Sequence, residues 1–298
     1  MQSLYSYLSV KSDNFVVAEK SMLKHFNEVV ELKFVLLSLL VELVKYADIF
    51  YEEGKKKHLP SLLDLNPNKR FVNNEFILSI KNNKSLMDKI SDFSFIWLKN
   101  DHDIIAKVFT VIIKSELYAK YLSSDNITLE YDKKFIIDVM SQHILNNQLV
   151  QHILEERSIY WIDDLPFIAT IIFGNIKSDI SMLSNKVFKD ISDKDFALSL
   201  FKNVIINNTE YENIIVRFSE NWELDRIAKM DQLILKMAFS EIISMPELPT
   251  KVSMNEYIEI SKYYSTLKSR NFVNGVLDNF VRTYTKEGKI RKYGRGLI

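Results

Sequence analysis

The fold is decided by Asn221-Trp-Glu-Leu-Asp-Arg-Ile-Ala-Lys-Met-Asp231, by Pro249-Thr-Lys-Val-Ser-Met-Asn255-Glu-Tyr-Ile-Glu259, and by Ser269-Arg-Asn-Phe-Val-Asn274-Gly-Val-Leu-Asp278. In and just beyond the last segment, apolar residues recur as they do on the buried face of an amphipathic helix. They are Phe272, Val273, Val276, Leu277, Phe280 and Val281. The pattern predicts a helix over residues 269–285 with Ser269 as its N-cap. Earlier helices are predicted near 210–219, 222–244 and 253–264.

The composition predicts an all-α protein. The 298 residues include only 6 Gly and 5 Pro, whereas a β-rich chain needs such residues at its many tight turns. A long helix or a helix pair is predicted over 15–53, and turn residues predict a loop over 59–68. Further helices are predicted near 76–82, 84–98, 101–122, 131–145 and 147–156. A hydrophobic content of 47% suffices for one large core or two small ones.

Several function classes find no support in the sequence. Cysteine is absent, which excludes disulfides and thiolate metal sites. There is no Gly-rich phosphate loop and no nucleophile elbow, so we expect neither an enzyme nor a cofactor. His143 and His152, with Glu155 and Glu156 nearby, are spaced poorly for one metal site on a helix, and no metal is expected.

The sequence also indicates where the protein works. The longest apolar run, residues 34–41, is much shorter than the roughly 20 residues that span a bilayer. The first residues lack the basic region of a signal peptide. We therefore expect a cytoplasmic protein that does not bind membranes.

Charge is unevenly distributed, although the whole chain has a formal net charge of zero. Residues 249–298 contain ten basic and four acidic side chains, a net charge of +6, so the rest carries −6. Such asymmetry indicates that one end meets an anion such as nucleic acid. A basic tail that is merely solvated is the alternative.

Taken in order, these segments resemble the NusB transcription antitermination family, whose members are small all-helical domains. The resemblance covers about residues 195–280, and Gln2-Ser-Leu4-Tyr5-Ser-Tyr7 resembles the end of the first NusB helix. It implies a NusB-like helical bundle with a large helical region inserted after the first helix, a long form similar to the NusB homologues of Bacteroidetes-type bacteria. The implied divisions are residues 1–9 (end of the first helix), 10–190 (extra helical region), 191–285 (NusB-like C-terminal domain) and 286–298 (basic tail).

One departure from the family concerns the N-terminus. An arginine-rich stretch normally precedes the Gln-Leu-Tyr helix, but here Met1 directly precedes Gln2. Either the true start lies upstream, or part of the RNA contact has been lost. We favour an upstream start, because so short a helix is costly to nucleate.

The resemblance implies that the protein binds boxA-type single-stranded RNA together with NusE, a small-subunit ribosomal protein, and acts on RNA polymerase, especially in ribosomal RNA operons. Single-strand recognition combines phosphate neutralisation with stacking of bases on aromatic rings. The implied RNA-binding residues are Gln2, Tyr5, Lys268, Ser269, Arg270 and Phe272. The family often has an acidic residue at position 268, so the lysine should strengthen phosphate contact. Phe272 also belongs to the apolar stripe, where it would be a core residue, and Tyr5 and Arg270 could be purely structural or solvated.

The implied NusE-binding residues are Asp225, Asp231 and Lys236 on the predicted 222–244 helix. At 3.6 residues per turn, Asp225 and Lys236 share a face, whereas Asp231 lies about a third of a turn away. The sequence leaves two alternatives to compare with this interpretation. A methyltransferase with a NusB-like domain is disfavoured, since that domain would come first in the chain. A helical scaffold for protein–protein interaction, with weak or no RNA binding, remains the main alternative.

Overall fold

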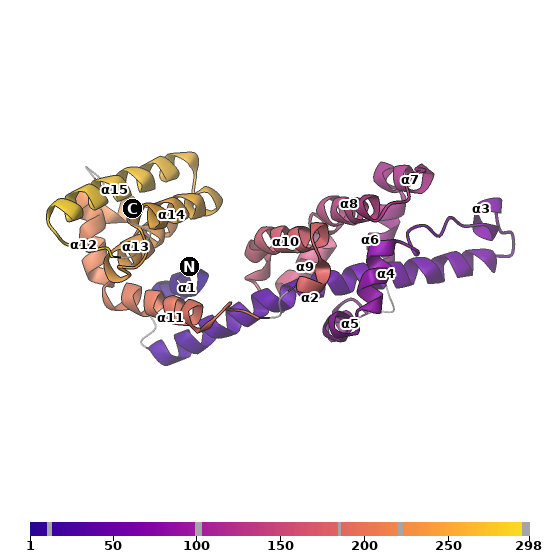
Figure 1. Cartoon of the computed structure of the whole chain (residues 1–298), viewed down its shortest axis with the longest axis horizontal. Coiled ribbons are helices and arrows are strands. Elements are labelled where there is room, and N and C mark those ends of the chain that lie inside the picture. Colours follow the sequence, from indigo (N-terminus) through magenta and orange to yellow (C-terminus); the bar gives the residue numbers. More distant parts are fainter. Residues whose placement is uncertain (11–13, 99–102, 184–185, 220–222, 294–298) are drawn as a thin grey trace. The chain divides into compact units, whose positions relative to one another are not determined.

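The computed structural model describes residues 1–10, 14–98, 103–183, 186–219 and 223–293, and within these ranges every regular element is a helix (Figure 1). The all-α prediction is confirmed. Contacts divide the chain into two compact units. The terminal unit comprises residues 1–23 and 188–298, and the inserted unit comprises residues 24–187.

The terminal unit joins the start of the chain to its C-terminal third. Its elements are α1 (Gln2–Val10), the first turns of α2 (Phe15–Lys55), α11 (Ile191–Ile206), α12 (Asn208–Phe218), the 3-10 turn η4 (Leu224–Arg226), α13 (Lys229–Ser244), α14 (Thr250–Tyr264) and α15 (Leu267–Lys286). Helix α13 is the centre of this unit, because every residue from Leu233 to Ile242 is buried. A helix that is buried all round must be surrounded by other helices, and α1, α11, α12, α14 and α15 contact it.

Aromatic packing joins α13 to α15. The rings of Phe239 and Phe280 lie 4.4 Å apart between centroids, and the Tyr284 ring lies 4.4 Å from that of Phe280.

Tyr257 of α14 donates a 2.7 Å hydrogen bond to Glu241 Oε2 of α13. Burial, with the negative charge of Glu241, raises the pKa of Tyr257 well above its usual range. The tyrosine therefore remains a hydrogen-bond donor that satisfies a buried carboxylate.

Two predicted helix boundaries in this unit are wrong. The predicted 222–244 helix is broken at Ile227 and Ala228, which separate η4 from α13. Two residues of the motif, Asn221 and Trp222, lie outside the described residues. The break lets Ile227 enter the core, and Gln232 Nε2 donates to Leu224 O and Ile227 O, both at 2.9 Å.

The second correction concerns the N-terminus of the last helix. Thr266, not Ser269, caps α15, because Thr266 has extended backbone angles and its Oγ1 accepts the N–H of Ser269 at 3.2 Å. Ser269 thus lies inside the first turn of the helix.

The inserted unit is built on α2. Its other elements are α3 (Leu62–Leu65), α4 (Glu75–Asn82), α5 (Lys84–Ser91), the 3-10 turn η1 (Ser94–Ile96), α6 (Asp103–Ile113), α7 (Glu116–Ser123), α8 (Leu129–Val139), the π-helical turn η2 (Met140–Ile144), α9 (Gln148–Arg157), α10 (Trp161–Lys177) and η3 (Ile180–Met182). Residues 32–44 of α2 are all buried. Two tryptophans anchor other elements to it: Trp97 Nε1 donates to Ser38 Oγ at 2.8 Å, and Trp161 Nε1 donates to Glu28 O at 3.0 Å.

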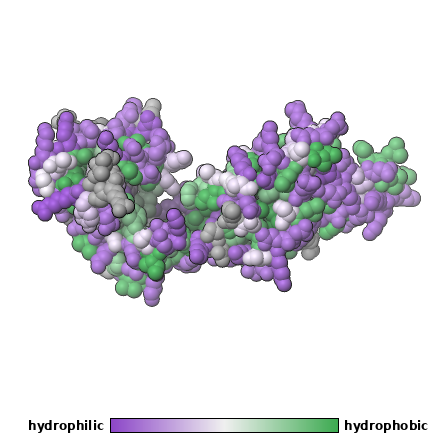
Figure 2. Space-filling model, viewed as in Figure 1, coloured by the Kyte–Doolittle hydropathy of each residue, from purple (hydrophilic) through white to green (hydrophobic). Residues whose placement is uncertain are grey.

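The structure shortens several predicted helices here. The predicted 101–122 helix is two helices, because Ser115 accepts the N–H of Tyr118 and starts α7; residues 101–102 lie outside the described ranges. The predicted 84–98 helix ends at Ser91. The predicted loop over 59–68 contains α3, a single helical turn, and hydrophobic side chains gather on the surface at this end of the unit (Figure 2).

No single helix within the described ranges is long and apolar enough to cross a membrane. Helices α9 and α10 reach that length and composition only as a pair, and they are bent by 112° where they meet.

Candidate nucleic-acid interface

A pocket lies where α15 begins, and we call it the α15 pocket. It has a volume of about 240 Å³ and is lined by Arg226, Ile227, Ala228, Asp231, Lys268, Ser269 and Phe272. The break between η4 and α13 therefore forms one wall, and the first turn of α15 forms the other. Three of the six predicted RNA-binding residues meet here: Lys268, Ser269 and Phe272.

The side chains of the α15 pocket differ in exposure. Lys268 is exposed, whereas Ser269, Arg270 and Phe272 are half-buried. The apolar stripe of α15 buries Val273, Val276, Leu277 and Phe280 in the core. Phe272 stands at the edge of that stripe and presents part of its ring to the pocket.

Two backbone N–H groups at this pocket and the Asp231 carboxylate already have hydrogen-bond partners within the protein. Ser269 N–H is donated to Thr266 Oγ1, and Arg270 N–H is donated to Thr266 O at 2.9 Å. Asp231 is buried, and it accepts a hydrogen bond from Ser265 Oγ. An anion in the α15 pocket would thus meet the Lys268 ammonium and the Arg226 guanidinium, and would find the Ser269 and Arg270 N–H groups already occupied.

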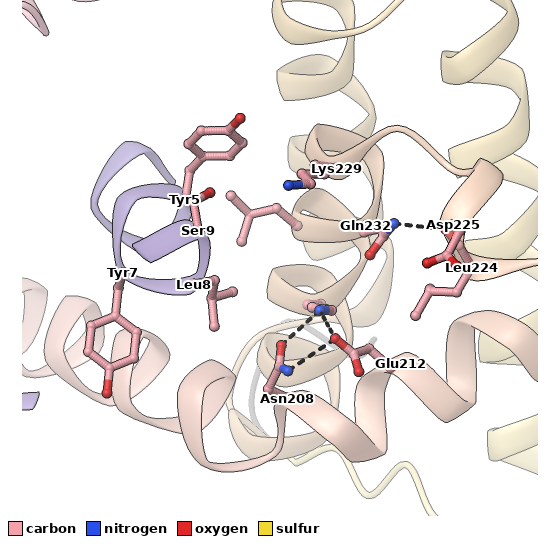
Figure 3. Close-up of a pocket in the computed structure, with 12 residues that line it drawn as sticks. Tyr5, Tyr7, Leu8, Ser9, Asn208, Glu212, Leu224, Asp225, Lys229 and Gln232 are labelled. Atoms are coloured by element: carbon pink, nitrogen blue, oxygen red, sulfur yellow. Dashed lines mark hydrogen bonds and ion pairs between the residues drawn. The ribbon is translucent and has the colours of Figure 1, made fainter. Parts of the chain in front are cut away.

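A second, larger groove lies beside α1, and we call it the α1 groove. It has a volume of about 560 Å³ and is lined by Tyr5, Tyr7, Leu8, Ser9, Asn208, Glu212, Leu224, Asp225, Lys229, Gln232, Leu233 and Lys236. Figure 3 shows Tyr5 on α1 and Lys229 on α13 on facing sides, with Asp225 farther along the groove. Tyr5 is 41% exposed and Lys229 and Asp225 are exposed, so this groove offers a ring and charges of both signs.

Lys236 lies at the bottom of the α1 groove, and its side chain is 6% exposed. Its Nζ donates to Asn208 Oδ1 and to Glu212 Oε1, each at 2.7 Å, and Asn208 Nδ2 donates to the same Glu212 oxygen at 3.1 Å (Figure 3). A buried ammonium requires such compensation, because an unpaired buried charge is strongly unfavourable. Lys236 therefore joins α13 to α12.

The structure sorts the predicted residues differently from the sequence. Tyr5 lies with Asp225 and Lys236 in the α1 groove, while Asp231 lies with Lys268, Ser269 and Phe272 in the α15 pocket. Gln2, in the first turn of α1, and Arg270, near the start of α15, line neither cavity. Arg226 and Lys229 both stand in the Asn221–Asp231 motif, but the sequence does not mark them as site residues, because their placement depends on the break after η4.

The described part of the predicted basic tail folds back on the terminal unit. Glu287 accepts from Arg217 at 2.6 Å and pairs with Lys289 at 2.7 Å, and Arg217, followed by Lys289, lowers the pKa of Glu287 to about 2. Lys292 Nζ donates to Met245 O at 2.9 Å, and burial lowers its pKa. Residues 294–298, which include Arg295, lie outside the described residues.

The described residues contain no group of three or more His, Cys, Asp or Glu side chains placed to hold a metal ion. His152 instead faces Glu156 at 3.5 Å. His143 stands apart in η2, where burial lowers its pKa.

Comparison with known proteins tests the family resemblance. The sequence model described as the NusB family matches residues 173–282. A protein from Salinibacter ruber named transcription antitermination protein NusB is 44% identical over 110 residues, which make up 37% of this chain and 69% of that protein. This chain belongs to the NusB family. The family prediction is confirmed.

Two further NusB relatives carry the same name. The protein from Chloroherpeton thalassium is 39% identical over 117 residues, 39% of this chain and 56% of that protein. The protein from Alkaliphilus oremlandii is 42% identical over 88 residues, 30% of this chain and 64% of that protein. The chain thus spans less than two thirds of these two relatives, and the NusB family match leaves residues 1–172 outside it. No solved protein structure matches the chain.

Proposed function

We propose that this NusB-family protein is a cytoplasmic transcription antitermination factor. In this proposal it binds boxA-type single-stranded RNA together with NusE, and the assembly acts on RNA polymerase, especially during transcription of ribosomal RNA operons. Family membership supports the antitermination role, because the names of its relatives state that role.

The observation that carries the RNA proposal is the composition of the α15 pocket. It combines a partly presented aromatic ring, Phe272, with two cationic side chains, Lys268 and Arg226. Single-stranded RNA is bound by base stacking on aromatic rings and by neutralisation of phosphates. Tyr5, 41% exposed in the α1 groove, offers a second ring on the same compact unit, and half-buried Arg270 adds a cation next to Ser269 in the first turn of α15.

The NusE proposal rests on the α1 groove. Asp225 presents an exposed carboxylate there, which suits a basic ribosomal protein. Lys236 is buried and hydrogen-bonded in the same groove, whereas Asp231 is buried and hydrogen-bonded at the α15 pocket, so we assign both residues the role of holding α13 in place. The two residues differ in this from Asp225, which makes the direct contact.

The test is the affinity for a boxA-type RNA oligonucleotide, with and without NusE, at two salt concentrations. We expect tighter binding with NusE, weaker binding at higher salt because phosphate contacts release counterions, and a loss of affinity for Arg270→Ala. An affinity that ignores salt and the Arg270→Ala change, or that is undetectable, would contradict the proposal. It would favour a helical scaffold that binds proteins only.

A further inference from the structure

A cluster of leucines stands on the surface of the inserted unit. We call Leu59, Leu62, Leu63 and Leu65 the leucine tip; they are 86%, 81%, 81% and 47% exposed. The leucines of α2 between residues 32 and 43 are, by contrast, completely buried. The surface shows hydrophobic side chains gathered at this end of the unit, beside α3 (Figure 2). A contiguous apolar patch on a protein surface marks an interaction site more often than scattered single apolar residues do.

The leucine tip is held in a defined shape by polar contacts. Asp64 Oδ2 accepts the N–H of Ser61 at 2.9 Å, and Ser61 Oγ accepts the N–H of Asp64 at 3.1 Å, which is a capping box. Lys57 pairs with Asp64 Oδ1 at 2.7 Å. The same oxygen would lie 3.1 Å from a Cβ added at Gly54, so this glycine allows α3 to approach the end of α2. Asp64 thus fastens the turn from inside, and the leucines face outward.

Charge argues against an anionic partner for the leucine tip. Across residues 52–66, the three lysines at 55–57 balance Glu52, Glu53 and Asp64. Lys55 pairs with Glu52 and Lys57 with Asp64. A segment without net positive charge is not drawn to nucleic acid or to an anionic lipid surface, both of which select clustered Lys and Arg.

Size and shape argue against a second copy of the chain. Four leucines expose roughly a few hundred Å², less than the roughly 800 Å² that each copy contributes to a stable dimer, so the tip suits one contact among several in a larger assembly. Two such projecting turns would touch over only part of that area. A concave apolar groove covers more of each leucine, because its walls close around the side chains.

We propose that the leucine tip docks into an apolar groove on a protein of the transcription complex, with an acidic group at the rim that receives Lys56. Lys56 and His58 are exposed at the base of the tip. The choice of partner rests on the proposed function, whereas the docking role rests on the tip itself. Docking through a pre-formed turn costs little conformational entropy, so a small anchor can contribute substantially to affinity.

The experiment measures binding of the full chain to reconstituted RNA polymerase elongation complexes that carry boxA RNA and NusE. We expect the double variant Leu62→Ser, Leu63→Ser to bind these complexes at least tenfold more weakly. Both side chains are more than four-fifths exposed, so the core stays intact. Asp64→Ala keeps all four leucines but loosens the turn, and should give a smaller loss.

A matched control replaces Ile159, a 70% exposed aliphatic residue between α9 and α10. Its neighbour Ser158 Oγ donates to Glu28 Oε2 at 3.2 Å. Glu28 lies about 40 Å from Gly54 along α2, at 1.5 Å per residue, so the control is far from the leucine tip. Ile159→Ser should bind like the natural protein.

The possible outcomes are distinguishable. A loss confined to the tip variants, at least tenfold for the double leucine variant and smaller for Asp64→Ala, supports docking. Unchanged binding of the tip variants, with boxA RNA and NusE binding intact, overturns the docking proposal alone. A tip-dependent change of mass in light scattering, or tip-dependent binding to phosphatidylglycerol vesicles, overturns it in favour of self-association or a membrane. Absence of RNA and NusE binding in the natural protein refutes the proposed function instead.

Discussion

Phe272 and Val273 are neighbours on α15 with opposite expected roles. Val273 is completely buried, whereas Phe272 is half-buried and lines the α15 pocket. Stacking of one base on an aromatic ring contributes about 1–3 kcal/mol, or roughly 5- to 150-fold in Kd. We therefore expect Phe272→Ala to weaken boxA RNA binding by about tenfold or more.

Val273→Ala should show the reverse behaviour. Removing two methyl groups from a completely buried site costs about 1–3 kcal/mol of unfolding free energy, and it leaves the pocket ring untouched. RNA affinity of the folded protein should change less than about twofold. Phe272→Ala should cost less stability than the roughly 3–5 kcal/mol typical of a fully buried Phe.

Two measurements separate the variants: fluorescence anisotropy of a labelled boxA-type RNA with NusE present, and guanidinium unfolding followed by circular dichroism. Because the chain has two compact units, unfolding need not be two-state. A transition that neither substitution moves would report the inserted unit and would serve as an internal reference. If Phe272→Ala loses several kcal/mol of stability and keeps its RNA affinity, then Phe272 is a core residue and the RNA assignment fails.

Other perturbations give equally definite expectations. Lys268→Ala and Arg270→Ala should each lower the slope of log K against log salt by about 0.7, the value per phosphate for single strands; an unchanged slope would place both side chains away from the RNA. Lys236→Met should destabilise the terminal unit by about 1–3 kcal/mol, because it leaves the partly solvated Glu212 carboxylate without its cationic partner. Adding Glu212→Gln should restore part of the lost unfolding free energy in a chemical unfolding series. No recovery in the double variant would contradict the pairing. Glu287 has a pKa of about 2 in the folded protein, below its ordinary 4.5. Its contribution to folding stability is therefore present above pH about 4.5 and is lost as the pH falls towards 2. Glu287→Gln should flatten the acid side of the curve of stability against pH, and a curve identical to that of the natural protein would argue against the Arg217 contact.

The sequence predicted those features of the fold that depend on local periodicity. The 3.6-residue pattern of Val273, Val276, Leu277 and Phe280 identified the face of α15 that the structure buries. The scarcity of Gly and Pro correctly indicated an all-helical chain. The ordered motifs of the C-terminal third identified the family, which the match over residues 173–282 confirms.

Features that depend on tertiary contacts could not be predicted from the sequence. No Gly or Pro marks the break at Ile227 and Ala228; burial of Ile227 and the two bonds from Gln232 stabilise it. That break decides that Asp225 lines the α1 groove while Asp231 turns inward to Ser265. Tyr5 reaches the same groove only because α1 packs on α13, more than 200 residues later.

The role of the predicted extra region, residues 10–190, also lay beyond local patterns. Composition indicated folded helices, and the structure describes a compact unit over residues 24–187 with α2 as its spine. The exposure of the four leucines at its tip depends on how Asp64 fastens α3 against Gly54. The turn residues of this segment predict a loop and do not show which side chains face solvent.

The most direct test of the central claim is terminator readthrough in single-round transcription with purified RNA polymerase. The template carries boxA upstream of a terminator, and the protein is added together with NusE. The account predicts that readthrough rises with protein concentration on the boxA template, and that it stays at its basal level when boxA is scrambled. Equal readthrough on both templates, or none on either while RNA binding is intact, would contradict it.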